Sequence, residues 1–247
     1  MKKPVRLLGF IALIVALTVS IGLNILLYRE AADNYRDLNG VRLDPLGLSV
    51  YSAANQQSLS AGRPVVVFIG DSRAADWPAP NLSNFTFVNR GIGAQTTAQV
   101  LGRFAQDVAP LKADTAVIQV GINDLKTLPL FPEQRASIVQ NTKENIMKLV
   151  QLSLDTGAQH VVVTTIFPLG EIPWERRLVW SDDVAVAIDE VNSFIATLAS
   201  DRVEVMNTSA TIAQDEIVLP KYRRDFLHIN SAGYAALNQE LERLLTR

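Results

Sequence analysis

The sequence predicts a three-layer α/β/α sandwich with a parallel sheet of about five strands, preceded by one N-terminal transmembrane helix. Three observations predict this fold class. Short apolar runs rich in β-branched residues recur after residue 64, longer segments with helical patterning separate them, and a long uncharged run lies near the N-terminus. Continuous apolar strands that alternate with helices are typical of a parallel sheet covered on both faces. Such sheets bind ligands beyond the carboxyl ends of their strands, so chemistry is expected just after each strand.

The uncharged run spans residues 7–28 and contains 22 residues. A helix of that length reaches about 33 Å, enough to cross a hydrocarbon core of roughly 30 Å. A secretory signal peptide has an apolar region of only about 7–15 residues and then a small-residue cleavage site. No A-x-A pattern follows this run. The pattern therefore favours a signal anchor that stays in the membrane, with secretion after cleavage as the alternative.

The basic residues before this run predict its orientation. Lys2, Lys3 and Arg6 lie in segment 1–6, which contains no acidic residue. Basic residues beside a membrane span remain preferentially in the cytoplasm. We therefore expect a cytoplasmic N-terminus and an extracytoplasmic remainder of the chain, on the periplasmic or cell-surface side.

The rest of the chain is predicted to contain a connector and one folded domain. Residues 29–61 form the connector, because Asn39-Gly40 and Asp44-Pro45 are turn signals, although the helix could continue briefly from residue 29 to 38. Residues 62–247 carry the alternating pattern of the domain. Strands are expected at 65–69, 85–88, 116–120, 161–166 and 203–206. Helices are expected at about 95–108, 134–157, 183–200 and 231–246.

Composition excludes several classes of site and partner. The chain has no cysteine, which excludes disulfides, thiolate zinc sites and cysteine nucleophiles. Three of the 23 basic residues precede the apolar run, so the remainder has fewer basic residues than the 25 acidic ones. That balance argues against nucleic acid as a partner. Only two histidines exist, and His160 opens the fourth predicted strand at its amino end, so His228 is the candidate for chemistry.

Three polar motifs directly follow predicted strands. They are Gly70-Asp71-Ser72-Arg73, the glycine-containing segment 89–97, and Gly121-Ile122-Asn123-Asp124. A serine at a strand-to-helix turn has an exposed Oγ and a backbone N–H at the start of a helix. Backbone and amide N–H groups that converge from the three motifs can form an oxyanion hole. Taken alone, each motif also fits an ordinary turn or helix cap.

A fourth motif, Asp225-Phe226-Leu227-His228, precedes the last predicted helix. A serine hydroxyl is a poor nucleophile unless an imidazole takes its proton, and that imidazole needs an acid on its other nitrogen. An aspartate three residues before the histidine can supply this acid from the same loop. Ser231 is interpreted as the cap of the last helix. The joint occurrence of four such motifs in one order makes independent structural explanations hard to sustain.

The blocks FIGDSR, VGIND and DFLH resemble those of the SGNH/GDSL hydrolase superfamily, and the resemblance covers about residues 64–245. It implies a flavodoxin-like α/β/α fold and a serine esterase or acylhydrolase that works through an acyl-enzyme. By this resemblance Ser72 is the nucleophile, His228 the general base and Asp225 its acid. The backbone N–H of Ser72 and the side chain of Asn123 would hold the oxyanion. The implied mechanism needs no metal ion and no organic cofactor.

One block departs from the family pattern N-x-G-x-x-G-x-T. Aligned on Asn89 and Thr96, its second glycine falls on Ala94, with Gly93 just before it. The oxyanion donor there is a backbone N–H, which alanine also has. A positive φ would strain an alanine by roughly 1 kcal/mol or more. We expect Ala94 to be the third donor, with Gly93 as the fallback.

Candidate substrate contacts are Arg73, Trp77, Trp174 and Trp180, and the long connection at 168–180 is of the kind that is often functional. Their side chains would suit a sugar, or an acyl chain with a polar head, unless the tryptophans simply close the rim of the core. The leading function is a carboxylic-ester hydrolase at the cell envelope, acting on O-acylated carbohydrate or lysophospholipid-like esters. A non-catalytic carbohydrate-binding or polysaccharide-assembly protein on the same fold, or an acyltransferase, is the alternative.

Overall fold

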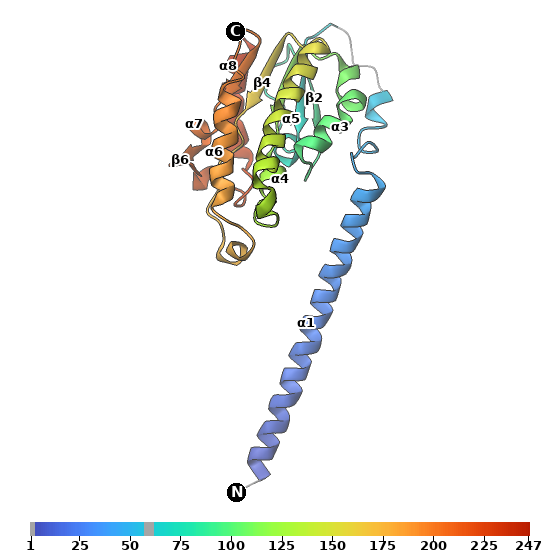
Figure 1. Cartoon of the computed structure of the whole chain (residues 1–247), viewed down its shortest axis with the longest axis vertical. Helices are drawn as coiled ribbons and strands as arrows, with labels where there is room; N and C mark the ends of the chain where they lie inside the picture. The colour runs from blue at the N-terminus through green and yellow to red at the C-terminus, as the bar shows by residue number, and fades with distance from the viewer. Residues whose placement is uncertain (1–2, 57–61) are drawn as a thin grey trace. The chain divides into compact units, whose positions relative to one another are not determined.

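The computed structural model describes residues 3–56 and 62–247, which form one unit up to Pro45 and a second from Leu46 to Arg247 (Figure 1). The first two residues of the predicted cytoplasmic segment and the last five of the predicted connector, 57–61, lie outside the described residues.

The first unit is essentially one helix, α1 (Lys3–Leu43). By length and composition, α1 is the one helix among the described residues that could cross a membrane. It extends well beyond the predicted span 7–28, and the turn predicted at Asn39-Gly40 is wrong, because both residues are helical. The side chain of Asn39 donates to the Tyr35 carbonyl one turn back. The helix ends just before Asp44-Pro45, where proline disfavours the helical conformation of the residue before it.

The second unit contains a five-stranded parallel sheet, as predicted. The strand order is β2-β1-β3-β4-β5, and every neighbouring pair is parallel. The strands are β1 (Val65–Gly70), β2 (Thr86–Gly91), β3 (Thr115–Gln119), β4 (His160–Thr164) and β5 (Val203–Met206). A small antiparallel pair, β6 (Ala213–Gln214) and β7 (Ile217–Val218), lies outside this sheet.

Helices cover both faces of the sheet, which confirms the three-layer prediction. The main helices are α3 (Thr97–Asp107), α5 (Arg135–Asp155), α6 (Asp183–Ala196) and α8 (Ser231–Leu245). Short helices are α2 (Ser72–Ala75), α4 (Ile122–Leu125) and α7 (Ser209–Ile212), and single 3₁₀ turns lie at Ala54–Gln56, Ala109–Leu111, Pro132–Gln134, Trp174–Leu178 and Pro220–Tyr222. In Figure 1, α5 and α6 lie side by side over the sheet.

The alternation of β1 explains how both faces are buried. Val65, Val67 and Ile69 belong to a core cluster that includes side chains of α3, α5 and α6. Val66 and Phe68 belong to the other cluster, which includes side chains of α8. Successive strand residues point to opposite faces, so a strand buried on both sides must be apolar throughout. The unbroken apolar run of β1 meets that requirement.

The N-terminal boundary of the last helix differs from the prediction by one residue. Asn230, not Ser231, caps α8: its side chain accepts a hydrogen bond from the Gly233 N–H, at 3.1 Å. Ser231 is already the first helical residue. Asparagine and serine are both good caps, so composition alone could not separate the two positions.

Residues 46–56 pack against the α/β/α sandwich and do not form a free linker. Leu46 contacts α3, since a Cβ placed on Gly102 would lie 2.7 Å from Leu46 Cδ2. The Leu48 carbonyl accepts a hydrogen bond from Gln106, at 3.2 Å. The predicted connector is therefore divided in the structure: its first part belongs to α1 and residues 46–56, called below the 46–56 segment, belong to the second unit.

Candidate active site

Ser72 lies at the turn between β1 and α2, at the carboxyl end of the sheet. The turn requires a glycine at position 70, which has a φ of +153° and whose Cβ, if present, would lie 1.7 Å from the Gln119 carbonyl oxygen. Asp71 then caps α2, because its Oδ1 accepts the Arg73 N–H at 2.9 Å. This places Ser72 as the first residue of the helix, half-buried at the carboxyl end of the sheet.

The structure brings Ser72, His228 and Asp225 into one line of hydrogen bonds. Ser72 Oγ lies 3.1 Å from His228 Nε2, although the two residues are 156 positions apart. On the other side of the ring, His228 Nδ1 lies 3.0 Å from Asp225 Oδ2. The spacing of the motif allows this because the loop folds back on itself: Asp225 Oδ1 also accepts the backbone N–H of His228, at 2.8 Å.

Asp225 is held in its ionised form by this loop. Partial burial raises the pKa of its carboxyl, but hydrogen bonds from the backbone N–H groups of Leu227 and His228 and from the His228 ring outweigh it. The pKa of Asp225 therefore lies below its ordinary value. A carboxylate in this position can orient the imidazole and stabilise its protonated form.

Arg73 fixes the loop that carries His228. Its guanidinium donates to the Leu227 carbonyl from Nε at 3.0 Å and Nη2 at 2.7 Å, and to the Phe167 carbonyl from Nη1 at 3.0 Å. The side chain is fully buried, and this burial, opposed by Asp71, lowers its pKa to about 10. This burial corrects the prediction that Arg73 contacts substrate, because its guanidinium donates to backbone carbonyls inside the protein.

The candidate oxyanion donors lie on the loop after β2 and on α4. Ala94 is exposed and has a φ of +62°, whereas Gly93 is not in the left-handed region. Gly93 lies beside the nucleophile, since a Cβ on it would be 3.9 Å from Ser72 Cβ. Asn123 is buried, and its Nδ2 donates to the Gln95 carbonyl at 2.9 Å. The structure therefore brings this loop to both Ser72 and Asn123.

The loop after β2 ends at the well-capped N-terminus of α3. Thr96 caps α3, with a reciprocal capping box to Gln99. Asp124 accepts hydrogen bonds from both the backbone N–H and the hydroxyl of Thr97, at 2.8 and 2.6 Å. These bonds join α3 to α4 and fix the position of Asn123, which precedes Asp124.

The three tryptophans have different surroundings. Trp77 is buried against Phe68, Phe167 and Tyr234, and its Nε1 donates to Asn238 at 2.7 Å. The prediction that Trp77 contacts substrate is thus corrected, and it is a core residue. Trp174 is 80% exposed, and Trp180 is half-buried.

A cavity of about 600 Å³ opens beside His228. Its walls come from the segment after α4, from the long connection that contains Trp180, and from the loop of the Asp225–His228 motif. Trp180 meets Phe226 edge-on, with ring centroids 5.2 Å apart, and the Arg176 guanidinium lies 5.9 Å from the Phe226 ring centroid. Leu130 and Val179 add apolar surface. Phe226 was overlooked in the sequence although it stands between the two polar residues of its motif.

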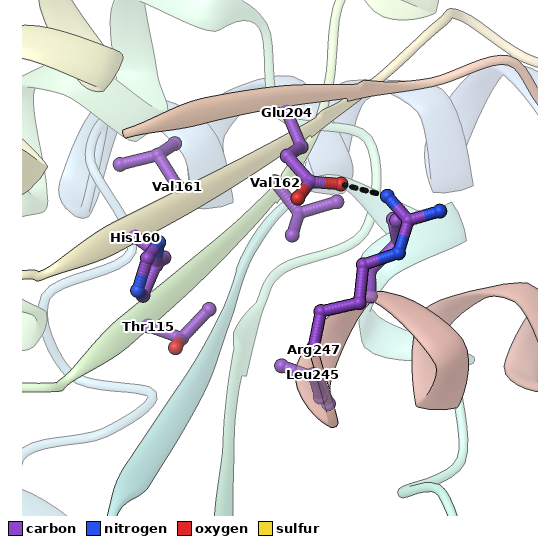
Figure 2. A pocket seen from close by; sticks show the side chains of 8 residues that line it. Thr115, His160, Val161, Val162, Glu204, Leu245 and Arg247 are labelled. Carbon is purple, nitrogen blue, oxygen red and sulfur yellow. Dashed lines mark ion pairs between the residues drawn. The ribbon is translucent and has the colours of Figure 1, made fainter. Parts of the chain in front are cut away.

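The second histidine lies at the amino end of the sheet, as predicted. Figure 2 shows His160 in a small cavity beside Thr115, with the Glu204–Arg247 ion pair at its margin. His160 is paired in register with Thr115, and both are the first residues of parallel strands. Ser72 and His228 lie beyond the carboxyl ends of the strands, so His160 is remote from them.

Comparison with known proteins identifies the family to which the chain belongs. The model of the GDSL-like lipase/acylhydrolase family matches residues 57–236, and the chain belongs to this family. It is a hydrolase that acts on ester bonds. No curated protein sequence matches the chain.

Solved structures share the fold at low sequence identity. A candidate acylhydrolase of Bacteroides fragilis is 22% identical, with a TM-score of 0.64, over 82% of this chain and 97% of that one. A GDSL-like lipase of Bacteroides thetaiotaomicron is also 22% identical, with a TM-score of 0.66, over 81% and 98%. An acetyl xylan esterase is 16% identical, with a TM-score of 0.58, over 73% and 99%.

Proposed function

We propose that the protein is a serine esterase that cleaves carboxylic esters through an acyl-enzyme, with Ser72, His228 and Asp225 as its catalytic triad. The observation that carries the proposal is the continuous line from Ser72 Oγ to His228 and on to Asp225, at 3.1 and 3.0 Å. A non-catalytic relative would have no need of this alignment.

The reaction follows from the positions of these three side chains. His228 Nε2 takes the proton from Ser72 Oγ as the oxygen attacks the ester carbonyl carbon, and Asp225 stabilises the imidazolium that forms. The imidazolium then gives this proton to the leaving alkoxide, which departs as the alcohol. A water molecule enters, loses its proton to the same nitrogen, and attacks the acyl-enzyme; Ser72 regains its proton and the carboxylic acid leaves.

The carbonyl oxygen becomes negatively charged in both steps and needs hydrogen-bond donors. We assign this role to the backbone N–H groups of Ser72 and Ala94 and to the side chain of Asn123. Asn123 Nδ2 carries two hydrogens, and only one is directed at the Gln95 carbonyl. Gly93 is the alternative to Ala94, since it also lies beside Ser72.

The cavity beside His228 supports an ester with an apolar part. Trp180 and Phe226 can pack against an acyl chain or a sugar ring, while Lys126 and Arg176 at its wall can meet a polar or anionic group. O-acylated carbohydrate and lysophospholipid-like esters both fit this combination. We further propose that α1 is a retained signal anchor and that the hydrolase unit is extracytoplasmic, in agreement with the apolar character of α1 and the basic residues before it.

Hydrolysis of aryl esters by the full-length chain in detergent tests the proposal. Acetyl, octanoyl and palmitoyl esters would be compared for wild type, Ser72→Ala and the control Ser137→Ala, which alters an exposed serine on α5. We expect Ser72→Ala alone to abolish turnover. If Ser72→Ala hydrolyses the esters as fast as wild type, the catalytic proposal is wrong. Adding an acceptor alcohol and measuring the new ester distinguishes an acyltransferase from a hydrolase.

A further inference from the structure

Gln95 connects the loop that bears Ala94 to the 46–56 segment. Its side chain is buried, and its Oε1 accepts a hydrogen bond from Arg103 Nε at 2.6 Å. Arginine has only donors, so the amide oxygen must face Arg103 and the amide nitrogen must face the other way. There Nε2 donates to the Leu46 carbonyl, at 2.8 Å. The backbone carbonyl of the same residue accepts Asn123 Nδ2, so Gln95 contacts a candidate oxyanion donor as well.

The 46–56 segment also holds the start of this loop. Tyr51 Oη donates to the Gly91 carbonyl at 2.5 Å, and its ring lies under the Arg90 guanidinium, 4.7 Å from the centroid. Asn55 reaches the same region, with its Oδ1 accepting from Arg90 Nη2 at 3.2 Å. Both ends of the Gly91–Gln95 loop are thus bonded to a segment that precedes the sheet in the sequence.

Gly47 allows the close approach of the two segments. Its φ is +70°, and a Cβ there would lie 2.9 Å from Gln95 Nε2 and 3.1 Å from Ile92 Cδ1. A side chain at position 47 would therefore be strained and would push directly against the loop. The packing leaves room for the backbone alone.

The same network reaches the nucleophile turn. Arg103 Nη2 donates to the Gly70 carbonyl at 3.2 Å, and Arg103 is paired with Asp107, with both side chains completely buried. Asp107 Oδ1 in turn accepts Asn55 Nδ2, at 2.7 Å. A displacement of the 46–56 segment would therefore shift both the loop after β2 and the Gly70 carbonyl, which lies two residues before Ser72.

Ala94 stands in the middle of this loop with a φ of +62°. An L-residue in the left-handed region is disfavoured, and it persists where the surrounding structure over-determines it. The bonds of Tyr51 and Gln95 fix the backbone on both sides of Ala94. They leave the direction of the Ala94 N–H little freedom.

We infer that the 46–56 segment is part of the catalytic unit, and that Tyr51 and Gln95 are positioning residues that hold the Ala94 N–H toward the oxyanion. The inference rests on the proposed function, because it needs an oxyanion to form at Ser72. It assigns a positioning role to a stretch of chain that lies shortly after α1.

Two pairs of substitutions in the full-length chain test this. Tyr51→Phe removes the hydroxyl that binds the Gly91 carbonyl and keeps the ring against the Arg90 guanidinium. Its control, Gln106→Ala, removes a hydrogen bond between the 46–56 segment and α3 that does not involve the loop. Gly47→Ala pushes the segment against Gln95; its control, Gly157→Ala, places an alanine at another positive φ, +115°, in open space.

The readouts are kcat and KM per titrated active site, and inhibition by an alkyl boronic acid, which forms a tetrahedral adduct with an active serine. We expect Tyr51→Phe and Gly47→Ala to lower kcat about three- to tenfold, with KM within twofold, and to weaken boronate inhibition by the same factor. Both controls should keep wild-type kcat. A purely structural role would lower the number of titratable sites and leave kcat per site unchanged.

The inference is overturned if kcat per site and boronate inhibition of Tyr51→Phe equal those of wild type. It is also overturned if Gln106→Ala or Gly157→Ala loses as much kcat as its partner. Tyr51→Phe keeps the aromatic ring in place, so it remains informative even where Gly47→Ala fails to fold. Failure of the proposed function gives a different result, since Ser72→Ala would then match wild type in the same assay.

Discussion

Replacing Ala94 with glycine is predicted to stabilise the protein and to leave its chemistry intact. Ala94 has a φ of +62°, a conformation that glycine adopts without penalty. The substitution removes only the Cβ, and the backbone N–H assigned to the oxyanion remains. The loop is exposed at this residue, so no buried contact is lost with the methyl group.

The expected magnitude is the difference between two opposing effects. Removing the strain stabilises the folded protein by about 1–2 kcal/mol, the usual penalty of an L-residue in the left-handed region. The greater freedom of glycine in the unfolded chain opposes this by about 0.4–1 kcal/mol. The free energy of unfolding should therefore rise by about 0.5–1 kcal/mol. Because the N–H is kept, kcat should stay within about twofold of wild type.

Urea unfolding and aryl-ester hydrolysis of wild type and Ala94→Gly measure the two parts. Lys112→Gly is the matched control, since Lys112 is another exposed residue with a positive φ, +45°, and lies on the loop before β3. It should gain similar stability. If Ala94→Gly lowers the free energy of unfolding while Lys112→Gly raises it, Ala94 does not occupy the left-handed conformation in solution, and the argument about its N–H fails with it.

Three further predictions concern the charged groups around Ser72. Asp225→Asn should lower kcat on the order of 10³- to 10⁴-fold with little change in KM, by analogy with the equivalent change in a serine protease; a loss below tenfold contradicts the role given to Asp225. Burial raises the pKa of Asp71 from 3.8 to about 6, opposed by Arg73, so the folded protein binds this proton more tightly than the unfolded chain. The stabilisation that this provides is present below about pH 4 and is lost as the pH rises through about 6. Asp71→Asn should accordingly gain up to about 3 kcal/mol of unfolding free energy over wild type between pH 4 and pH 7, and urea titrations that show a constant difference would refute this. Arg73→Met leaves the Leu227 and Phe167 carbonyls without their donors and should cost about 3–5 kcal/mol, measured in the same titrations; a loss under 1 kcal/mol would contradict the role of Arg73 in holding the loop.

The sheet could be predicted from the sequence because its signals are local. The run Val65–Gly70 is apolar at every position, and only a strand buried on both faces requires that. The placement of Ser72 after this strand and of His160 at the start of another follows from the direction of parallel strands. These features need no knowledge of which residues meet across the fold.

The surroundings of Arg73 and Trp77 could not be predicted in the same way. The sequence alone suggests that Arg73 is a surface residue near the active site. Its hydrogen-bond partners are carbonyl groups more than ninety positions away, so its burial cannot be inferred from its neighbours in the sequence. Trp77 reads as a rim aromatic until Asn238 on α8 is seen to accept its N–H. The packing of the 46–56 segment on the loop after β2 could not be predicted either. Its hydrogen bonds to Gln95 and Gly91 depend on the close approach of two backbone segments. Gly47 permits this approach, but a single glycine in a sequence does not indicate which segment comes close to it.

Two buried arginines explain how a site assembled from distant loops can be rigid. Arg73 follows the nucleophile and binds the carbonyl of Leu227, beside His228; Arg103 binds the carbonyl of Gly70, before the nucleophile, and the side chain of Gln95. Burying a guanidinium is unfavourable, and burial lowers the pKa of both. A guanidinium, however, presents five donors in a fixed plane, so one side chain can bind two loops at once in a defined geometry. An apolar core residue would pack as tightly but could not satisfy these carbonyls or fix the loops in register. Arg73 thus holds the loop of the base, His228, on one side of Ser72, and Arg103 holds the loop of the candidate oxyanion donor Ala94 on the other.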